Sequence, residues 1–317
     1  MSSTALDKFK DMFSDVSENV SNTYSKISDD KQGIFSSKYI YIGLFLVIVV
    51  CMIIAYTLYY IITTKLFSNI RQVVDETRIP VMCTEKRRFD FEVKTTGNGE
   101  RRSYTFWIYI HDMNRYTGNY KNVFNIQTTS SVSDPSKASP FVFLDKANNR
   151  MYVRFNTFNT PNTPPSVTSY NNLTESTLTT FMKSGIVIPY IPLQRWVHVA
   201  IVCNANSYKN YIYAYVDGDL VSTTSHNEKD RYLGDNDASK KDLTKLNINQ
   251  KGIVNVGGEI NSTEGCGFSG LVSKISTFNY ELNQRDVYND YYWGPIGNLL
   301  ARIGLGMYGV RNPIYKL

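Results

Sequence analysis

Few side chains in this chain of 317 residues have the types and spacing that catalysis requires. The sequence contains three histidines, His111, His198 and His226, and none lies near a cysteine, so zinc binding is not expected. Acidic pairs occur in Asp90-Phe91-Glu92 and Asp217-Gly218-Asp219, and exposed strand or turn positions explain both. The sequence has no glycine-rich phosphate loop and no Gly-x-Ser-x-Gly nucleophile elbow. We therefore predict a protein that is not an enzyme.

The charge pattern indicates which partners the chain could have. The formal net charge is +6, and residues 65–317 carry +7 while residues 1–64 carry −1. Basic side chains cluster in Lys86-Arg87-Arg88 and Arg101-Arg102, where they could contact anionic lipid headgroups or an acidic protein. No nucleic-acid-reading motif accompanies them, so nucleic acid is not an expected partner.

A long uncharged segment predicts a membrane anchor. Residues 39–64 contain no charged side chain, and the central run 42–55 is apolar on every helical face. A helix needs about 20 such residues to cross a bilayer. A buried core helix rarely has so long a run, and a cleavable signal peptide would begin nearer the N-terminus. We expect a single transmembrane helix over 38–64 and hence a lipid bilayer as a partner. Nearby Lys and Arg are balanced, so they leave the orientation open.

Three further segments flank the anchor and the rest of the chain. Residues 1–37 contain an apolar stripe with helical spacing, so we predict an amphipathic helix that packs on a protein, with a membrane-surface helix as the alternative. Residues 65–80 are predicted to form a helical stalk that ends before Pro80. The last segment, 294–317, is apolar and glycine-rich, and we expect this tail to dock on a partner or on the preceding domain.

Between these segments, residues 81–293 have the pattern of an all-β domain. Short runs of β-branched and aromatic residues are separated by turn residues, without intervening helical periodicity. This pattern predicts antiparallel sheets packed as a sandwich or barrel. Asp217-Gly218, between two such runs, is a hairpin signal, because a type I′ turn needs positive φ at both central positions.

Two stretches of this domain carry a family resemblance. The first is the strand of Trp196, His198 and Ala200, followed by the Asp217-Gly218 hairpin. The second runs from Gly257-Gly258 through Phe268-Ser269-Gly270 to residues 282–287. Together they resemble the concanavalin A-like, laminin-G-like jelly-roll family. The resemblance covers about 95 residues and implies a jelly-roll sandwich of antiparallel sheets, in which these residues have structural roles.

The resemblance also guides the interpretation of single residues. It implies that Trp196 is a core or inter-sheet residue and that His198 is buried and hydrogen-bonded. Glucanases of this fold carry a Glu-x-Asp-x-x-Glu strand, which is absent from this sequence. Calcium occurs in the family, and Asp235 and Asp237 could bind it, although a solvated acidic loop explains them as well. No cofactor is demanded.

The cysteines permit at most one disulfide within the domain. Cys51 lies in the apolar run, which leaves Cys83, Cys203 and Cys266. Cys83 and Cys266 lie near opposite ends of the domain sequence, and the ends of a sandwich often meet, so these two are the candidate pair. Cys203 lies in an apolar strand and is expected to be a buried thiol.

Two functions follow from this organisation. Membrane-anchored, Asn- and Tyr-rich jelly rolls resemble virion proteins of large double-stranded DNA viruses, which have an internal membrane beneath a capsid. We therefore expect a minor capsid or membrane protein that links the virion's internal membrane to capsid or other shell proteins. The alternative is a membrane-anchored lectin or adhesin that binds glycans through loops at the edge of the sandwich, with exposed aromatic residues such as Tyr116 and Tyr120.

Overall fold

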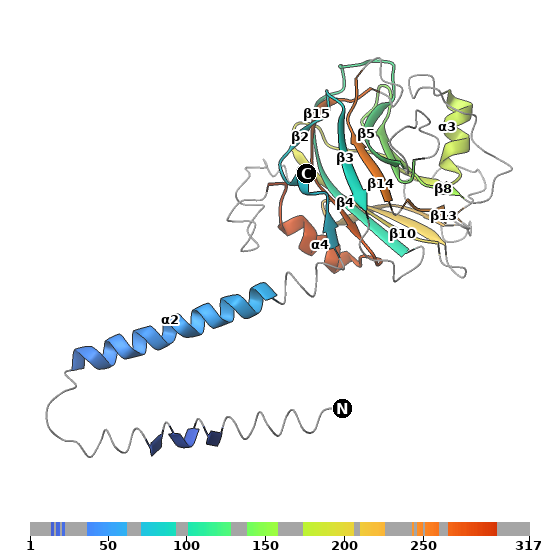
Figure 1. Cartoon of the computed structure of the whole chain (residues 1–317). Coiled ribbons are helices and arrows are strands. Elements are labelled where there is room, and N and C mark those ends of the chain that lie inside the picture. Colours follow the sequence, from blue (N-terminus) through green and yellow to red (C-terminus); the bar gives the residue numbers. More distant parts are fainter. Residues whose placement is uncertain are drawn as a thin grey trace. The chain divides into compact units, whose positions relative to one another are not determined.

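The computed structural model describes residues 14–15, 17–19, 21–22, 37–61, 71–92, 101–127, 138–157, 174–205, 210–225, 243, 246–249, 251–259 and 266–296. The chain divides into two units, Met1–Thr64 and Lys65–Leu317. Figure 1 shows a long helix in the first unit and strands in the second.

The first unit contains the helix α2, Ser37–Ile61. Its segment Tyr41–Tyr60 is long and apolar enough to cross a membrane, and none of that segment is buried against the protein. A helix that exposes apolar side chains on every face is suited to lipid rather than to water. Seven residues between Ser14 and Asn22 are helical, whereas the apolar stripe predicted for residues 1–37 lies outside the described residues.

The second unit is built from two antiparallel sheets. Among the described residues, sheet A has the strand order β1-β15-β4-β10-β11-β12, with β2 paired to β15, and sheet B has the order β3-β14-β5-β6-β7-β9. The strands of sheet A are β1 (Arg71–Val73), β2 (Val81–Met82), β4 (Arg101–Asp112), β10 (Trp196–Asn204), β11 (Tyr211–Val216), β12 (Asp219–Ser225) and β15 (Ser269–Phe278). Those of sheet B are β3 (Arg87–Glu92), β5 (Lys121–Gln127), β6 (Phe141–Leu144), β7 (Met151–Arg154), β9 (Gly185–Ile188) and β14 (Lys251–Val256). A short pair, β8 (Asn156–Thr157) and β13 (Leu246–Asn247), lies outside both sheets.

The core lies between the two sheets, and side-chain alternation explains which residues enter it. In β10, Val197, Val199 and Ile201 point into the core, and they pair with the inward residues of β4. Sheet B contributes apolar side chains such as Phe124 and Val254 to the same core. Cys203 continues the inward series of β10. Successive strand residues face opposite sides, so the alternate residues of β10 point to the outer face of sheet A.

Helices cover the outer faces of both sheets. The helix α4, Gln284–Tyr292, packs through Val287 on an apolar cluster of the outer face of sheet A that includes Ala200 and Val202. The helix α3, Glu175–Met182, packs through Phe181 on the aromatic outer face of sheet B. In Figure 1 the two helices lie on opposite sides of the sandwich. A single-turn 3-10 helix, η2 (Asp75–Arg78), connects β1 to β2.

The predicted all-β sandwich of antiparallel sheets is confirmed, and the Asp217-Gly218 turn has positive φ at both positions, 53° and 94°. The helical stalk predicted for 65–80 is wrong for its described part. Arg71–Val73 is instead a strand that pairs with β15. The helical spacing of apolar residues there was also compatible with a short edge strand, and only pairing with a strand distant in sequence decides between them.

Candidate functional site

The candidate site is built around Asp290 in α4. Asn283 caps this helix through a capping box, in which its side chain accepts a hydrogen bond from the backbone N–H of Asp286 at 2.9 Å. Residues three apart share a helix face, so Asp290 points to the sheet together with Val287. Both side chains are buried. The cap and the apolar contact therefore place a carboxylate on the outer face of sheet A.

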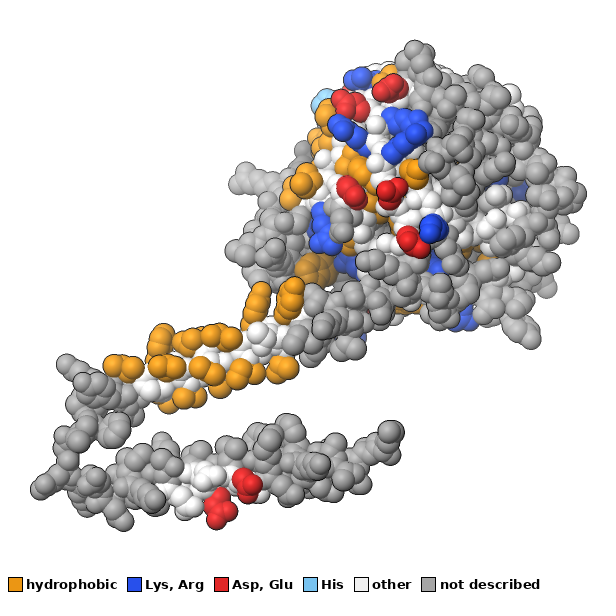
Figure 2. All heavy atoms as spheres, in the orientation of Figure 1, with side chains coloured by type: hydrophobic (Ala, Val, Ile, Leu, Met, Phe, Trp, Pro, Cys, Tyr) orange, Lys and Arg blue, Asp and Glu red, His pale blue; other side chains and the backbone are white. Residues whose placement is uncertain are grey.

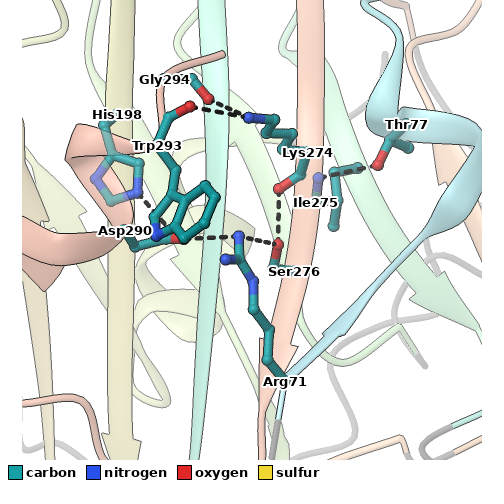
Figure 3. Close-up of polar contacts among 9 residues, drawn as sticks. All are labelled: Arg71, Thr77, His198, Lys274, Ile275, Ser276, Asp290, Trp293 and Gly294. Atoms are coloured by element: carbon teal, nitrogen blue, oxygen red, sulfur yellow. Dashed lines mark hydrogen bonds and ion pairs between the residues drawn. The ribbon is translucent and has the colours of Figure 1, made fainter. Parts of the chain in front are cut away.

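Asp290 binds two basic side chains from distant strands (Figure 3). Its Oδ1 lies 2.6 Å from Nη2 of Arg71 in β1, and its Oδ2 lies 3.0 Å from Nε2 of His198 in β10. The Arg71 guanidinium also donates to Ser276 Oγ at 3.3 Å. Together with Lys274, which follows in β15, these residues form the ion cluster: Arg71, His198, Lys274, Ser276 and Asp290.

The electrostatics of the ion cluster favour an ionised Asp290. Burial alone would raise the pKa of this carboxyl. The charge of Arg71 and the hydrogen bond with His198 outweigh burial and hold the pKa well below its ordinary range. A buried carboxylate is stable only when it is paired and hydrogen-bonded, and Arg71 and His198 meet that requirement here.

Lys274 connects the ion cluster to the residues that follow α4. Its ammonium donates to the carbonyl oxygens of Trp293 and Gly294, at 3.1 and 2.6 Å. Burial, together with the nearby charges of Arg71 and Arg78, lowers the pKa of Lys274 to about 8, while the charge of Asp290 opposes the shift. A cation at the carboxyl end of a helix satisfies carbonyl groups that lack helical partners. Lys274 therefore fixes the point at which the chain leaves α4.

The ion cluster holds structural elements together, and its His198–Asp290 pair is buried. His198 is fully buried, and its ring contacts those of Trp107 and Tyr291, with centroid distances of 5.1 and 6.0 Å. A general base must come within hydrogen-bonding reach of its substrate. The enclosed His198–Asp290 pair instead joins β10 to α4.

The structure places the residues of the family signature in two groups. His198, Asp217 and Gly218 lie together, since the His198 amide donates to Asp217 Oδ1 at 2.9 Å and Tyr288 of α4 lies over Gly218. Trp196 was predicted to be a core or inter-sheet residue, and it is buried but does not lie between the two sheets. By alternation with Val197 it points to the outer face of sheet A, where its ring contacts that of Tyr109 at 5.7 Å.

The second group lies where β14 ends and β15 begins. Phe268 is fully buried in the core. Gly257 has a φ of +63°, and a Cβ there would lie 2.6 Å from the carbonyl oxygen of Cys83. A Cβ at Gly270 would lie 2.1 Å from the Tyr109 carbonyl oxygen, so only glycine fits there. Gly258 accepts a backbone hydrogen bond from Gly267. These glycines allow neighbouring backbone segments to approach each other closely.

The predicted disulfide is not formed. Cys83, Cys203 and Cys266 are all buried, and none of them is in a disulfide. The ends of the domain do meet, since the Phe268 amide donates to the Cys83 carbonyl at 3.2 Å. The Cys83 Sγ, however, donates to the Val81 carbonyl at 3.7 Å, and burial raises the pKa of this thiol above its ordinary value. Backbone contact at this junction therefore does not require a covalent link.

The loop residues predicted for ligand binding lie in different environments. Tyr120 is buried in the aromatic cluster beneath α3, so its predicted exposure is wrong. Tyr116 is half-buried, with the Arg115 guanidinium 5.2 Å from its ring. Tyr190, which the sequence did not single out, is 59% exposed. Asp235, Asp237 and residues 297–317 of the tail lie outside the described residues.

Sequence reasoning missed Arg71, Lys274 and Asp290. Nothing in the sequence distinguishes Arg71 and Lys274 from other charged residues. The one usable signal was the spacing of Val287 and Asp290, which suggests that a helix after residue 283 buries both on one face.

Comparisons with known proteins give no family for this chain. No protein-family model matches it, and no curated protein matches it. Among solved structures, it is similar to the binding domain of botulinum neurotoxin serotype D, with 13% identity and a TM-score of 0.39 over 66% of this chain and 41% of that chain. The type G receptor-binding domain gives 12% identity and a TM-score of 0.35 over 67% of this chain and 45% of that chain. This chain thus spans less than half of either structure, and values this low say nothing about what it binds.

Proposed function

We propose that this protein is a non-enzymatic, single-pass membrane protein whose β-sandwich ties a bilayer to a protein partner. The helix α2 would be the anchor, because its segment Tyr41–Tyr60 is long and apolar enough to cross a bilayer. The observation that carries the proposal is the ion cluster. It joins β1, the first described strand after α2, to α4 and to the centre of sheet A.

This attachment suits a tether. β1 pairs with β15 over only three residues, and so short a ladder would hold weakly on its own. The buried Arg71–Asp290 ion pair adds a second attachment, and removing one partner of a buried pair typically costs about 3–5 kcal/mol. A force on the start of the sandwich is therefore shared between β15 and α4.

More specifically, we propose that the protein links the internal membrane of a virion to its capsid shell. Two hydrogen bonds support this link to a shell protein. Ser273 donates to the Pro295 carbonyl and Lys274 donates to the Gly294 carbonyl, so both fix the start of the apolar tail. An apolar segment that leaves a folded domain from a fixed point is suited to docking on a neighbouring protein.

The test is co-purification from intact particles, comparing the full chain with a variant that lacks residues 297–317. We expect both proteins to resist carbonate extraction from the membrane, because both keep α2. Only the full chain should bring down a shell protein. Release by carbonate would contradict the anchor, and equal capture of the shell protein by both would contradict the role of the tail.

The glycan-binding alternative keeps one supporting observation, the exposure of Tyr190. An exposed aromatic ring offers a flat apolar face and a hydroxyl for a sugar. Glycan-array binding that is lost in Tyr190→Ala and kept in the matched Tyr292→Ala variant would favour a lectin. No binding to any glycan, together with capture of a shell protein, would favour the tether.

A further inference from the structure

Exposed apolar side chains gather beside the ion cluster. Among the described residues outside α2, large exposed apolar side chains occur at seven positions, and five of them flank β2, η2 and the end of α4. These five form the apolar patch: Ile79, Met82, Tyr292, Trp293 and Ile296. Figure 2 shows apolar side chains, with Lys and Arg among them, along an edge of the sandwich.

Hydrogen bonds bring the two sides of the apolar patch together. Ser273 Oγ lies 3.2 Å from the carbonyl oxygen of Thr77 and 2.6 Å from that of Pro295. Ile79 is two residues beyond Thr77, and Ile296 directly follows Pro295. A single hydroxyl group therefore places the η2 side of the patch next to its α4 side.

Met82 extends the patch along the same face. It lies opposite Leu271 in the β2–β15 ladder, whereas its neighbour Val81 packs against the core. Because strand residues alternate, Met82 points to the outer face of sheet A, as Ser273 does. The patch is thus continuous over the outer side of the β2–β15 edge.

The composition of the patch matches a membrane interface. Tryptophan and tyrosine are enriched at the boundary between headgroups and hydrocarbon, where their apolar rings and polar groups are both satisfied. Ile79 is 76% exposed and Trp293 is 37% exposed, which in water leaves their apolar surface unburied. Lys274 and Arg78 border the patch, whereas Glu76 is exposed close by. Attraction to anionic lipid is therefore not the main contribution to binding of the patch at a membrane interface.

The patch also lies close to Arg71, the first residue of the sandwich that the structure describes. Ten residue steps separate Ile61 from Arg71, and fully extended they reach at most about 35 Å. The Arg71 side chain binds Asp290, whose carbonyl oxygen accepts from the Trp293 amide at 3.2 Å. A bilayer that holds α2 is consequently within reach of the patch.

We propose that the apolar patch docks on the interface of the bilayer that anchors the chain. The inference rests on the proposed function only for the anchor itself. The sandwich would then be held at the membrane surface at two places, by its covalent connection and by Trp293 with its neighbours. Docking at two places restricts rotation of the sandwich and orients its opposite loops away from the lipid.

Tryptophan fluorescence of the full chain tests this proposal. The chain has three tryptophans, and Trp107 and Trp196 are 2% and 8% exposed, so Trp293 is the accessible one. In vesicles of phosphatidylcholine brominated near the top of the acyl chains, we expect quenching relative to unbrominated vesicles. Trp293→Phe should lose most of that quenching. Ile79→Ser should weaken it, whereas Leu193→Ser, a matched exposed site away from the patch, should not.

Each other outcome overturns the proposal. Equal quenching in the unsubstituted chain and in Trp293→Phe would place Trp293 away from lipid. Shielding of Trp293 from acrylamide in detergent alone would assign the patch to residues 297–317, or to a second copy if it depended on protein concentration. Carbonate extraction separates the two proposals, because a chain that is retained without quenching keeps its anchor but does not dock.

Discussion

At the scale of single residues, Asp290 is the group on which the ion cluster depends. Its carboxylate is the only acidic side chain among the five residues of the cluster, and it faces Arg71, His198 and Lys274. Without it, basic groups would be buried together without compensation, which costs far more than the loss of one hydrogen bond.

We expect Asp290→Asn to lower the free energy of unfolding at pH 7 by about 3–5 kcal/mol, because it leaves Arg71 partly buried and unpaired. Urea unfolding of the full chain in detergent, followed by tryptophan fluorescence, measures the change. The double variant Arg71→Met with Asp290→Asn is the control and should recover part of the loss, since it removes both charges. No recovery would contradict the ion pair.

The pH dependence of this difference has a definite sign. The pKa of Asp290 is lowered by folding, so its contribution is complete above the ordinary carboxyl pKa of 3.8 and declines as the pH falls below it. The stability difference between the unsubstituted chain and Asp290→Asn should therefore shrink below about pH 4. A difference that stays constant to lower pH would mean that the carboxylate is not held ionised.

At the scale of elements, the cap of α4 determines whether Asp290 reaches the sheet. Asn283 and Asp286 satisfy each other's backbone amides at the start of the helix. The helix is only nine residues long, and helices of this length have little stability of their own. Its position therefore depends on the cap, on Val287 and on the ion cluster together.

We expect Asn283→Ala to destabilise the protein by about 1 kcal/mol, the usual cost of losing an N-cap side chain. Arg285→Ala, at an exposed position two residues further in the same turn, is the matched control and should change little. Hydrogen exchange of the α4 amides should rise in Asn283→Ala and not in the control. Unchanged exchange would show that packing alone holds the helix.

At the scale of the whole molecule, the sandwich and α2 belong to two separate compact units. We expect the fragment 65–317 to unfold cooperatively without the anchor. The fragment 75–317 lacks β1 and Arg71 and should be less stable by about 3 kcal/mol. In that shorter fragment, Asp290→Asn should have a smaller effect than in 65–317, because its main partner is already gone. Equal effects in both fragments would contradict the role of β1.

The sequence by itself determined the features that depend on neighbouring residues. Uninterrupted apolar composition sufficed for the α2 segment, because a membrane-spanning helix satisfies its own backbone. Alternation and turn residues sufficed for β10, β11 and the Asp217-Gly218 hairpin, because strand periodicity and positive φ are local properties. The burial of His198 followed from its place in an apolar strand.

Only the tertiary structure decided which distant residues meet. His198 and Asp290 are 92 positions apart, and Arg71 reaches Asp290 from the opposite end of the domain. The antiparallel register of β15 with β1 and β4 brings these strands together, and register depends on the whole sheet. For the same reason the sequence left open which face of sheet A buries Trp196, and it misplaced Tyr120. The side of a sheet that another element covers is set by packing between layers, and no local pattern records it.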